Sequence, residues 1–203
     1  MGMDLHYQAM PDNCELLMRS QHDPNFGCEL EFFEQNVSRS QKLLDAFNNL
    51  TLVEFVDQAR KLVRQFPGLE HRNLWLDRRW DMLYYLLSER RRNGEERDES
   101  NWVEKAIFGG RVLNNATQTT IGFKIRYLNP AEVLDVREYL EMLTTSDLQI
   151  HWNPSAMYQA GVYKCFPSTD EQTLEWIQDD VEKLKIFYAL VAQKGEGVLT
   201  FIS

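Results

Sequence analysis

Cysteine and long apolar runs are scarce in this 203-residue chain. Its three cysteines, Cys14, Cys28 and Cys165, form no Cys-x-x-Cys motif, so neither a disulfide framework nor a zinc finger is expected. Free thiols are typical of a reducing compartment, and we expect a cytoplasmic protein. No stretch approaches the roughly 18 consecutive apolar residues of a membrane-spanning helix, and the first residues do not resemble a signal peptide. A membrane partner is therefore not expected.

Positive charge is also in short supply. The chain has 22 Lys and Arg against 31 Asp and Glu, which gives a net charge of −9. Binding to nucleic acid needs basic residues that neutralise phosphates, so no nucleic-acid partner is expected. The imbalance is largest in residues 1–59, with three basic and ten acidic side chains, whereas residues 60–97 form a positive island with ten basic and six acidic side chains. An acidic surface is compatible with a basic protein partner, or with solubility alone.

The motifs of several enzyme classes are missing. The four histidines show no His-x-x-x-His spacing, so we expect no metal, and there is no Gly-x-Ser-x-Gly nucleophile motif. The glycines of Phe108-Gly109-Gly110-Arg111 follow a predicted helix and match no phosphate-binding motif, so we expect no cofactor. Cys165 is expected to be a buried thiol rather than a nucleophile. The sequence alone therefore indicates no reaction.

The apolar pattern predicts a helical α+β fold. Alternating apolar residues predict a strand near residues 3–9 and another at 119–128, and the apolar segment 198–202 predicts a central strand. Capping residues predict many helices, the longest from Asp170 to Gly195. We expect one domain over residues 1–203, predominantly helical. A small mixed or antiparallel sheet should join the N- and C-terminal strands and the 119–128 strand.

The most distinctive segment runs from Leu74 to Leu87. On a helix its apolar residues form one stripe, made of Leu76, Trp80, Leu83, Tyr84 and Leu87. Asp77 and Asp81 lie beside this stripe, one turn apart, where two carboxylates repel. Either Asp77 caps the helix, or the neighbouring arginines or a bound cation neutralise the pair.

This segment supplies the candidate site, a cleft between an Asp77–Tyr85 helix and the glycine turn. Trp80 is expected as an apolar wall, Asp81 as an acceptor, a tyrosine as a hydroxyl donor and an arginine as a cation. The candidate residues are Asp77, Arg79, Trp80, Asp81, Tyr84, Tyr85, Gly109 and Gly110. The structural alternative is a capped helix whose aspartates satisfy buried donors, with glycines that end the next helix at positive φ. His6, on the polar face of the first strand, is expected at the surface.

The order of motifs resembles one family. Leu76-Asp77-Arg78-Arg79-Trp80-Asp81-Met82-Leu83, followed by Lys105-Ala106-Ile107-Phe108-Gly109-Gly110, is similar to the YfbM-like family of bacterial proteins, a domain of unknown function (1877). The start Met1-Gly2-Met3 and the ending Val198-Leu199-Thr200-Phe201-Ile202 are also similar to that family's ends. The resemblance implies a compact α+β fold in a bacterial cytoplasmic protein. It implies no activity.

Two functional hypotheses follow. The first is a non-enzymatic protein-interaction or regulatory module, such as an immunity-type protein that neutralises a basic toxin by electrostatic attraction. The alternative is a small-molecule-binding protein or hydrolase that uses the Trp80/Asp81 cleft, with Asp81 as general base. No oligomeric state is predicted.

Overall fold

The computed structural model describes residues 3–47, 49–88 and 101–203. Its centre is an antiparallel sheet of five strands in the order β2-β1-β5-β4-β3. The strands are β1 (Leu5–Met10), β2 (Asn73–Leu76), β3 (Arg111–Val112), β4 (Arg126–Leu128) and β5 (Gly197–Ile202). The strands from the two ends of the sequence, β1 and β5, pair along their whole length. The predicted α+β class and the sheet that joins both terminal strands are confirmed.

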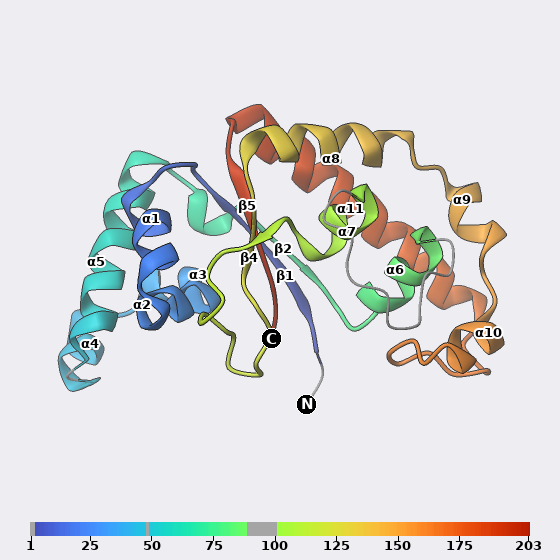
Figure 1. The fold of residues 1–203 in the computed structure, drawn as a ribbon, viewed down its shortest axis with the longest axis horizontal. Coiled ribbons are helices and arrows are strands. Elements are labelled where there is room, and N and C mark those ends of the chain that lie inside the picture. Colours follow the sequence, from blue (N-terminus) through green and yellow to red (C-terminus); the bar gives the residue numbers. More distant parts are fainter. Residues whose placement is uncertain (1–2, 48, 89–100) are drawn as a thin grey trace.

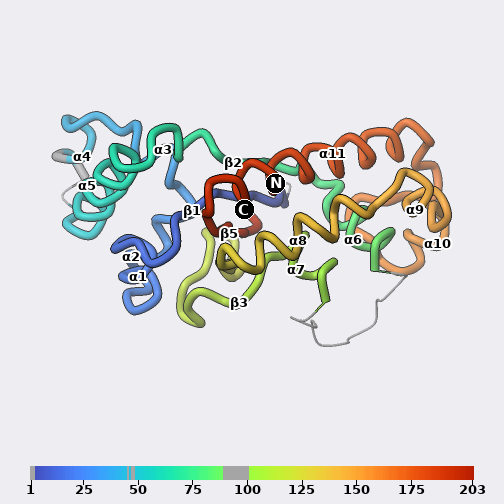
Figure 2. Tube along the Cα trace, turned by 90° about the horizontal axis from the view of Figure 1, so that it is seen from above, coloured from blue at the N-terminus to red at the C-terminus, as the bar shows by residue number. Residues whose placement is uncertain are grey.

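Two groups of helices flank this sheet. The first group is α1 (Glu15–His22), α2 (Pro24–Cys28), the 3-10 helix η1 (Glu29–Phe32), α3 (Phe33–Ser38), α4 (Gln41–Phe47), α5 (Leu50–Gln65) and the 3-10 helix η2 (Leu69–His71). The second is α6 (Trp80–Leu87), α7 (Trp102–Phe108), α8 (Pro130–Met142), α9 (Thr145–Ile150), α10 (Pro154–Gln159) and α11 (Glu171–Lys194). Figure 1 shows α1–α5 to the left of the sheet and α6–α11 to the right, and the view from above also separates them (Figure 2). Within the described residues, no helix is both long and apolar enough to span a bilayer.

The second group of helices covers the sheet face that carries Leu5, Tyr7 and Ala9. The Tyr7 ring packs against Phe187 and Tyr188 of α11, and its hydroxyl donates to the carbonyl of Ile107 at 3.0 Å. Burial of such large side chains is the main favourable term in folding, at about 25 cal/mol per Å² of apolar surface. This face is therefore the main core of the protein.

Helix α11 forms between the two capping residues that predict its ends, Asp170 and Gly195. The Asp170 side chain accepts from the amide of Thr173, and Gly195 ends the helix with φ of 64° in the left-handed region. Its inward stripe is fully buried and includes Ile177, Leu184 and Val191. Because α11 contacts β2 and β5 and leads directly into β5, it helps to fix the position of the central strand.

Two predicted boundaries are wrong. Residues 119–128 contain only the short strand β4, because the chain turns at Gly122, where φ is 91° and the Gly122 amide donates to the carbonyl of Thr119. Helix α6 begins at Trp80 rather than at Asp77, since residues 73–76 pair with β1 as a strand. Asp77 is therefore not the N-cap; its carboxylate accepts from the amide of Arg78 at 2.7 Å.

Candidate functional site

The first candidate residues, Trp80 and Asp81, point into the protein. Trp80 is 7% exposed and its indole Nε1 donates to the carbonyl of Met3 at 2.9 Å. Asp81 is 6% exposed, and its Oδ2 accepts from the amide of Tyr163 at 2.6 Å. A buried carboxylate that accepts from a main-chain amide satisfies a donor that would otherwise be costly to bury. The geometry therefore gives the Trp80/Asp81 hydrolase alternative no support.

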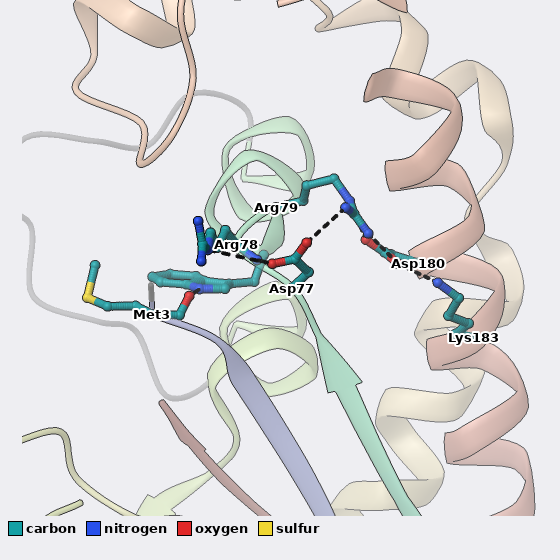
Figure 3. Close-up of polar contacts among 7 residues, drawn as sticks. Met3, Asp77, Arg78, Arg79, Asp180 and Lys183 are labelled. Carbon is teal, nitrogen blue, oxygen red and sulfur yellow. Dashed lines mark hydrogen bonds and ion pairs between the residues drawn. The ribbon is translucent and has the colours of Figure 1, made fainter. Parts of the chain in front are cut away.

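Asp77 and Arg79 belong to an ion-pair network that joins the start of α6 to α11 (Figure 3). Arg79 Nε donates to Asp180 Oδ2 at 3.0 Å, and Arg79 Nη1 lies 3.4 Å from Asp77 Oδ2. Lys183 Nζ contacts the other oxygen of Asp180 at 2.9 Å. The Asp180 side chain is only 3% exposed, so its charge needs both cations. Asp77 is thus neutralised by arginine, while Asp81 turns into the core.

The expected cleft between α6 and the glycine turn contains an aromatic ring. Phe108 packs edge-on against Trp80, with ring centroids 5.6 Å apart, and against Tyr84 at 4.9 Å. The Tyr84 hydroxyl donates to the Glu104 carboxylate, and Tyr85 is buried. These side chains therefore meet each other rather than an open cleft.

The two glycines allow the end of α7 to pack closely on the sheet. Gly109 has φ of 80°, and a Cβ there would lie 2.8 Å from Thr200 Oγ1. A Cβ on Gly110 would lie 2.6 Å from the carbonyl oxygen of Tyr127. Contacts this short are not tolerated, so both positions need glycine. This is the structural interpretation of the glycine pair.

A pocket of about 260 Å³ lies beside the sheet face that carries the His6 and Trp75 side chains. Across the strands β2, β1 and β5, Trp75 lies opposite His6, and His6 lies opposite Phe201. The three rings are nearly parallel: His6 and Trp75 are 6.1 Å apart at 8°, and His6 and Phe201 are 5.2 Å apart at 4°. We call the pocket and this row of rings the sheet-face site.

The walls of the sheet-face site are acidic. Glu31 of η1 and Glu34 of α3 line it, and among the described residues its lining contains no lysine or arginine. Glu34 Oε2 accepts from the Asn73 side chain at 3.1 Å, and Glu31 accepts from the amide and the hydroxyl of Thr120 at 2.7 and 2.9 Å. The carboxylates are held in place by these donors. Glu34 Oε1 also lies 3.7 Å from Nδ1 of His71, so a protonated His71 would compete with a ligand for this charge.

His6 is expected to be neutral at pH 7. Burial lowers the pKa of its imidazole below the ordinary value of 6.5, and the nearby Asp4 carboxylate only partly opposes this shift. Its Nε2 lies 2.8 Å from the Ser203 hydroxyl. A neutral His6 leaves the sheet-face site with acidic charge alone.

The first prediction concerns this pKa. An NMR titration of the His6 ring protons should give a pKa below 6.5. Because folding lowers the pKa, protonation favours the unfolded state, and the contribution of His6 to stability should be lost as the pH falls below about 6.5. A His6→Gln variant should show a smaller loss of stability between pH 7 and pH 5. A His6 pKa above 6.5 would contradict the prediction and place a cation in the site.

Within the described residues, little supports a metal site or a cysteine nucleophile. No group of three or more His, Cys, Asp or Glu side chains there is placed to hold a metal ion. Burial raises the pKa of the Cys14 and Cys165 thiols, which disfavours the nucleophilic thiolate. The arrangement can hold planar and cationic groups, and we find no acid–base pair placed for catalysis in it.

Sequence reasoning missed the sheet-face site. His6 was expected at the surface, but it is partly buried between two rings, because residues 73–76 and 197–202 pair on either side of its strand. The three rings come from positions 6, 75 and 201, so no local spacing reveals them. The sequence did contain the alternation that puts His6 on one face of β1. That Trp75 and Phe201 lie beside His6 follows only from the strand register.

Comparisons with known proteins indicate a family and a fold. Residues 26–201 match the model of the family described as "Domain of unknown function (DUF1877)". The structure is similar to a crystal structure described as a protein of unknown function, YfbM from Escherichia coli. That match has a TM-score of 0.59 and 17% sequence identity, and it covers 98% of this chain and 99% of the other. No curated protein matches the chain.

Proposed function

Since the chain belongs to the DUF1877 family, whose function is unknown, we propose from its geometry that it is a non-enzymatic protein-interaction module. In this proposal the sheet-face site binds a basic segment of a partner protein. The observation that carries the proposal is the combination of an exposed tryptophan, a stacked row of rings and two glutamates in one pocket.

The aromatic row supports the binding of a cation. Trp75 is 61% exposed, although large aromatic side chains are usually buried. One face of its indole stacks on His6, which leaves the other face toward the sheet edge. A guanidinium or ammonium group over a tryptophan face gains about 0.5–1 kcal/mol when exposed and about 2 kcal/mol when desolvated.

The acidic charge supports the same kind of partner. Residues 1–59 carry the largest excess of acidic side chains, and they form β1 and the first helices, including η1 and α3 beside the site. Such a field attracts a basic segment over several ångströms and increases its association rate. Glu31 and Glu34 then provide direct partners for its cationic groups.

The second prediction tests this proposal with a designed basic peptide, acetyl-Thr-Arg-Val-Arg-Val-Arg-Thr-amide. Calorimetric titration should show binding that weakens with added salt, and an otherwise identical peptide with Glu for Arg should not bind. Trp75→Ala should weaken binding roughly 3- to 30-fold, because it removes the cation–π contact. Glu34→Gln should weaken it to a smaller extent.

The matched control is Trp176→Ala. Trp176 is also half-exposed, at 45%, but it lies on α11 beside a different pocket. This variant should leave binding unchanged. The proposal fails if the basic peptide does not bind, or if the Trp75 and Trp176 variants bind it equally well.

A further inference from the structure

Strand β2 has an open edge. It lies at one end of the strand order, so among the strands that the structure describes β1 is its only neighbour (Figure 1). Edge strands are usually protected by lysine, proline or a bulge. The β2 sequence, Asn73-Leu74-Trp75-Leu76, contains no charged residue and no proline. The protection that remains is the shortness of β2 and helix α11, which packs against it.

The hydrogen-bond register shows which main-chain groups point outward. The amide of Ala9 donates to the carbonyl of Arg72 at 2.9 Å, so alternate residues Ala9, Tyr7 and Leu5 bond toward β2. The main-chain N–H and C=O groups of their partners Leu74 and Leu76 therefore point toward β1. In an antiparallel ladder, the main-chain groups of the residue between two such partners point away from the neighbouring strand. The main-chain N–H and C=O of Trp75 therefore face the open edge.

The other side of β1 gives the same register. Asp4 and Ser203 exchange two main-chain hydrogen bonds, at 2.9 and 3.1 Å, so the even-numbered residues of β1 bond toward β5. This confirms that odd-numbered residues bond toward β2. In the described part of the chain, no further hydrogen bond to the main chain of Trp75 is found. Trp75 thus combines an exposed ring with unpaired ladder groups.

We propose that the basic segment binds as a sixth strand, antiparallel to β2, with one cationic side chain against the open face of Trp75. This inference rests on the proposed function. A residue directly opposite Trp75 would have its side chain on the same sheet face, about 4.5–5.5 Å away, and would extend the row formed by Trp75, His6 and Phe201. This is the geometry of a cation–π contact.

The same register specifies a pattern in the partner. The residue two positions after the first cation would lie opposite Asn73, and the residue two positions before it would lie beyond the end of β2. Asn73 is bonded to Glu34, so the position opposite Asn73 offers acidic surroundings. Asp77 is already paired with Arg78 and Arg79 and offers no free negative charge. The segment should be extended and carry two basic side chains, one opposite Trp75 and one opposite Asn73, as other peptides that add to sheet edges use alternate side chains for specificity.

The third prediction uses the wild-type protein and methylated forms of the basic peptide described above. In antiparallel pairing, the arginine opposite Trp75 exchanges both of its main-chain hydrogen bonds with Trp75, while the valines point away. N-methylation of the central arginine should therefore weaken binding at least tenfold, because it removes a donor and adds steric conflict at the edge. N-methylation of a valine should change affinity less than twofold.

The outcomes separate the two proposals. If the parent peptide binds and only arginine methylation weakens it, the sixth strand is supported, and hydrogen exchange of the Trp75 amide should slow in the complex. If both methylated peptides bind like the parent, while Trp75→Ala still weakens binding, the sixth strand is refuted and the proposed function stands. If the parent peptide does not bind, the proposed function itself is refuted.

Discussion

Replacing Glu196 by glutamine is expected to lower the free energy of unfolding by about 3–5 kcal/mol, because it leaves a buried guanidinium without its counter-charge. Arg72 Nε and Nη2 donate to the two carboxylate oxygens of Glu196 at 2.9 and 2.7 Å. The two side chains are only 11% and 3% exposed. Glutamine offers one acceptor and places an amide N–H₂ group against the other guanidinium donor.

The position of this pair explains the size of the effect. Arg72 immediately precedes β2 and Glu196 immediately precedes β5, so the ion pair connects two strands on either side of β1. Chemical denaturation should show the loss directly. A chain of this length should also melt at a temperature lower by about 2–4 °C for each kcal/mol lost.

The matched control is Glu141→Gln. Arg137 and Glu141 form an ion pair at 2.8 Å on α8, but their side chains are 37% and 53% exposed. This variant should lose less than about 1 kcal/mol. A double variant, Arg72→Leu with Glu196→Leu, should lose less than Glu196→Gln, because it buries no unpaired charge. Equal losses for Glu196→Gln and Glu141→Gln would contradict the prediction.

Sequence reasoning worked best where local signals agree over many residues. The longest helix has an aspartate cap, a glycine end and a buried stripe repeated over its length, and the structure forms it from Glu171 to Lys194. Helix α8 has Asn129 as its N-cap: the Asn129 side chain accepts from the amide of Glu132, while the Glu132 carboxylate accepts from the amide of Asn129. These contacts lie within one turn of the chain, so the sequence alone contains them.

Sequence reasoning failed where a short segment fits both the helical period of about 3.6 residues and the strand period of two. Leu74 and Leu76 fit a helix that continues through Trp80, yet residues 73–76 form a strand. Four residues are too few for periodicity to decide, and the pairing with β1 decides instead. In the 119–128 segment the cause is the turn at Gly122, after which only residues 126–128 pair with β5.

The candidate site shows the same limit. Asp77, Trp80 and Asp81 are close in sequence, so their composition was visible, but the strand–helix boundary at residues 77–79 sends their side chains in different directions. The sheet-face site depends on Trp75, His6 and Phe201, which become neighbours only through strand register. Local pattern therefore identified unusual residues, while long-range pairing determined which of them face solvent.

Gly197→Ala is expected to be the second most damaging substitution, because there is no space for a side chain at the start of the central strand. A Cβ at this position would lie 2.3 Å from the Tyr127 hydroxyl oxygen and 2.5 Å from the carbonyl oxygen of Leu128. Tyr127 is fully buried, and its hydroxyl donates to Asp12 at 3.0 Å. Core packing and this hydrogen bond therefore keep its ring from moving away from a new side chain. The β4 main chain cannot yield without losing its pairing with β5.

Overpacking of a rigid core costs about 1–3 kcal/mol, and more where the main chain must move. We therefore expect Gly197→Ala to lose at least about 3 kcal/mol of unfolding free energy, measured by chemical denaturation. Tyr127→Phe removes the closest atom and should itself lose about 1 kcal/mol through the bond to Asp12. In that background Gly197→Ala should cost less than in the wild type, and the difference measures the steric conflict. If Gly197→Ala costs the same in both backgrounds, the Tyr127 hydroxyl is not what excludes a side chain from Gly197.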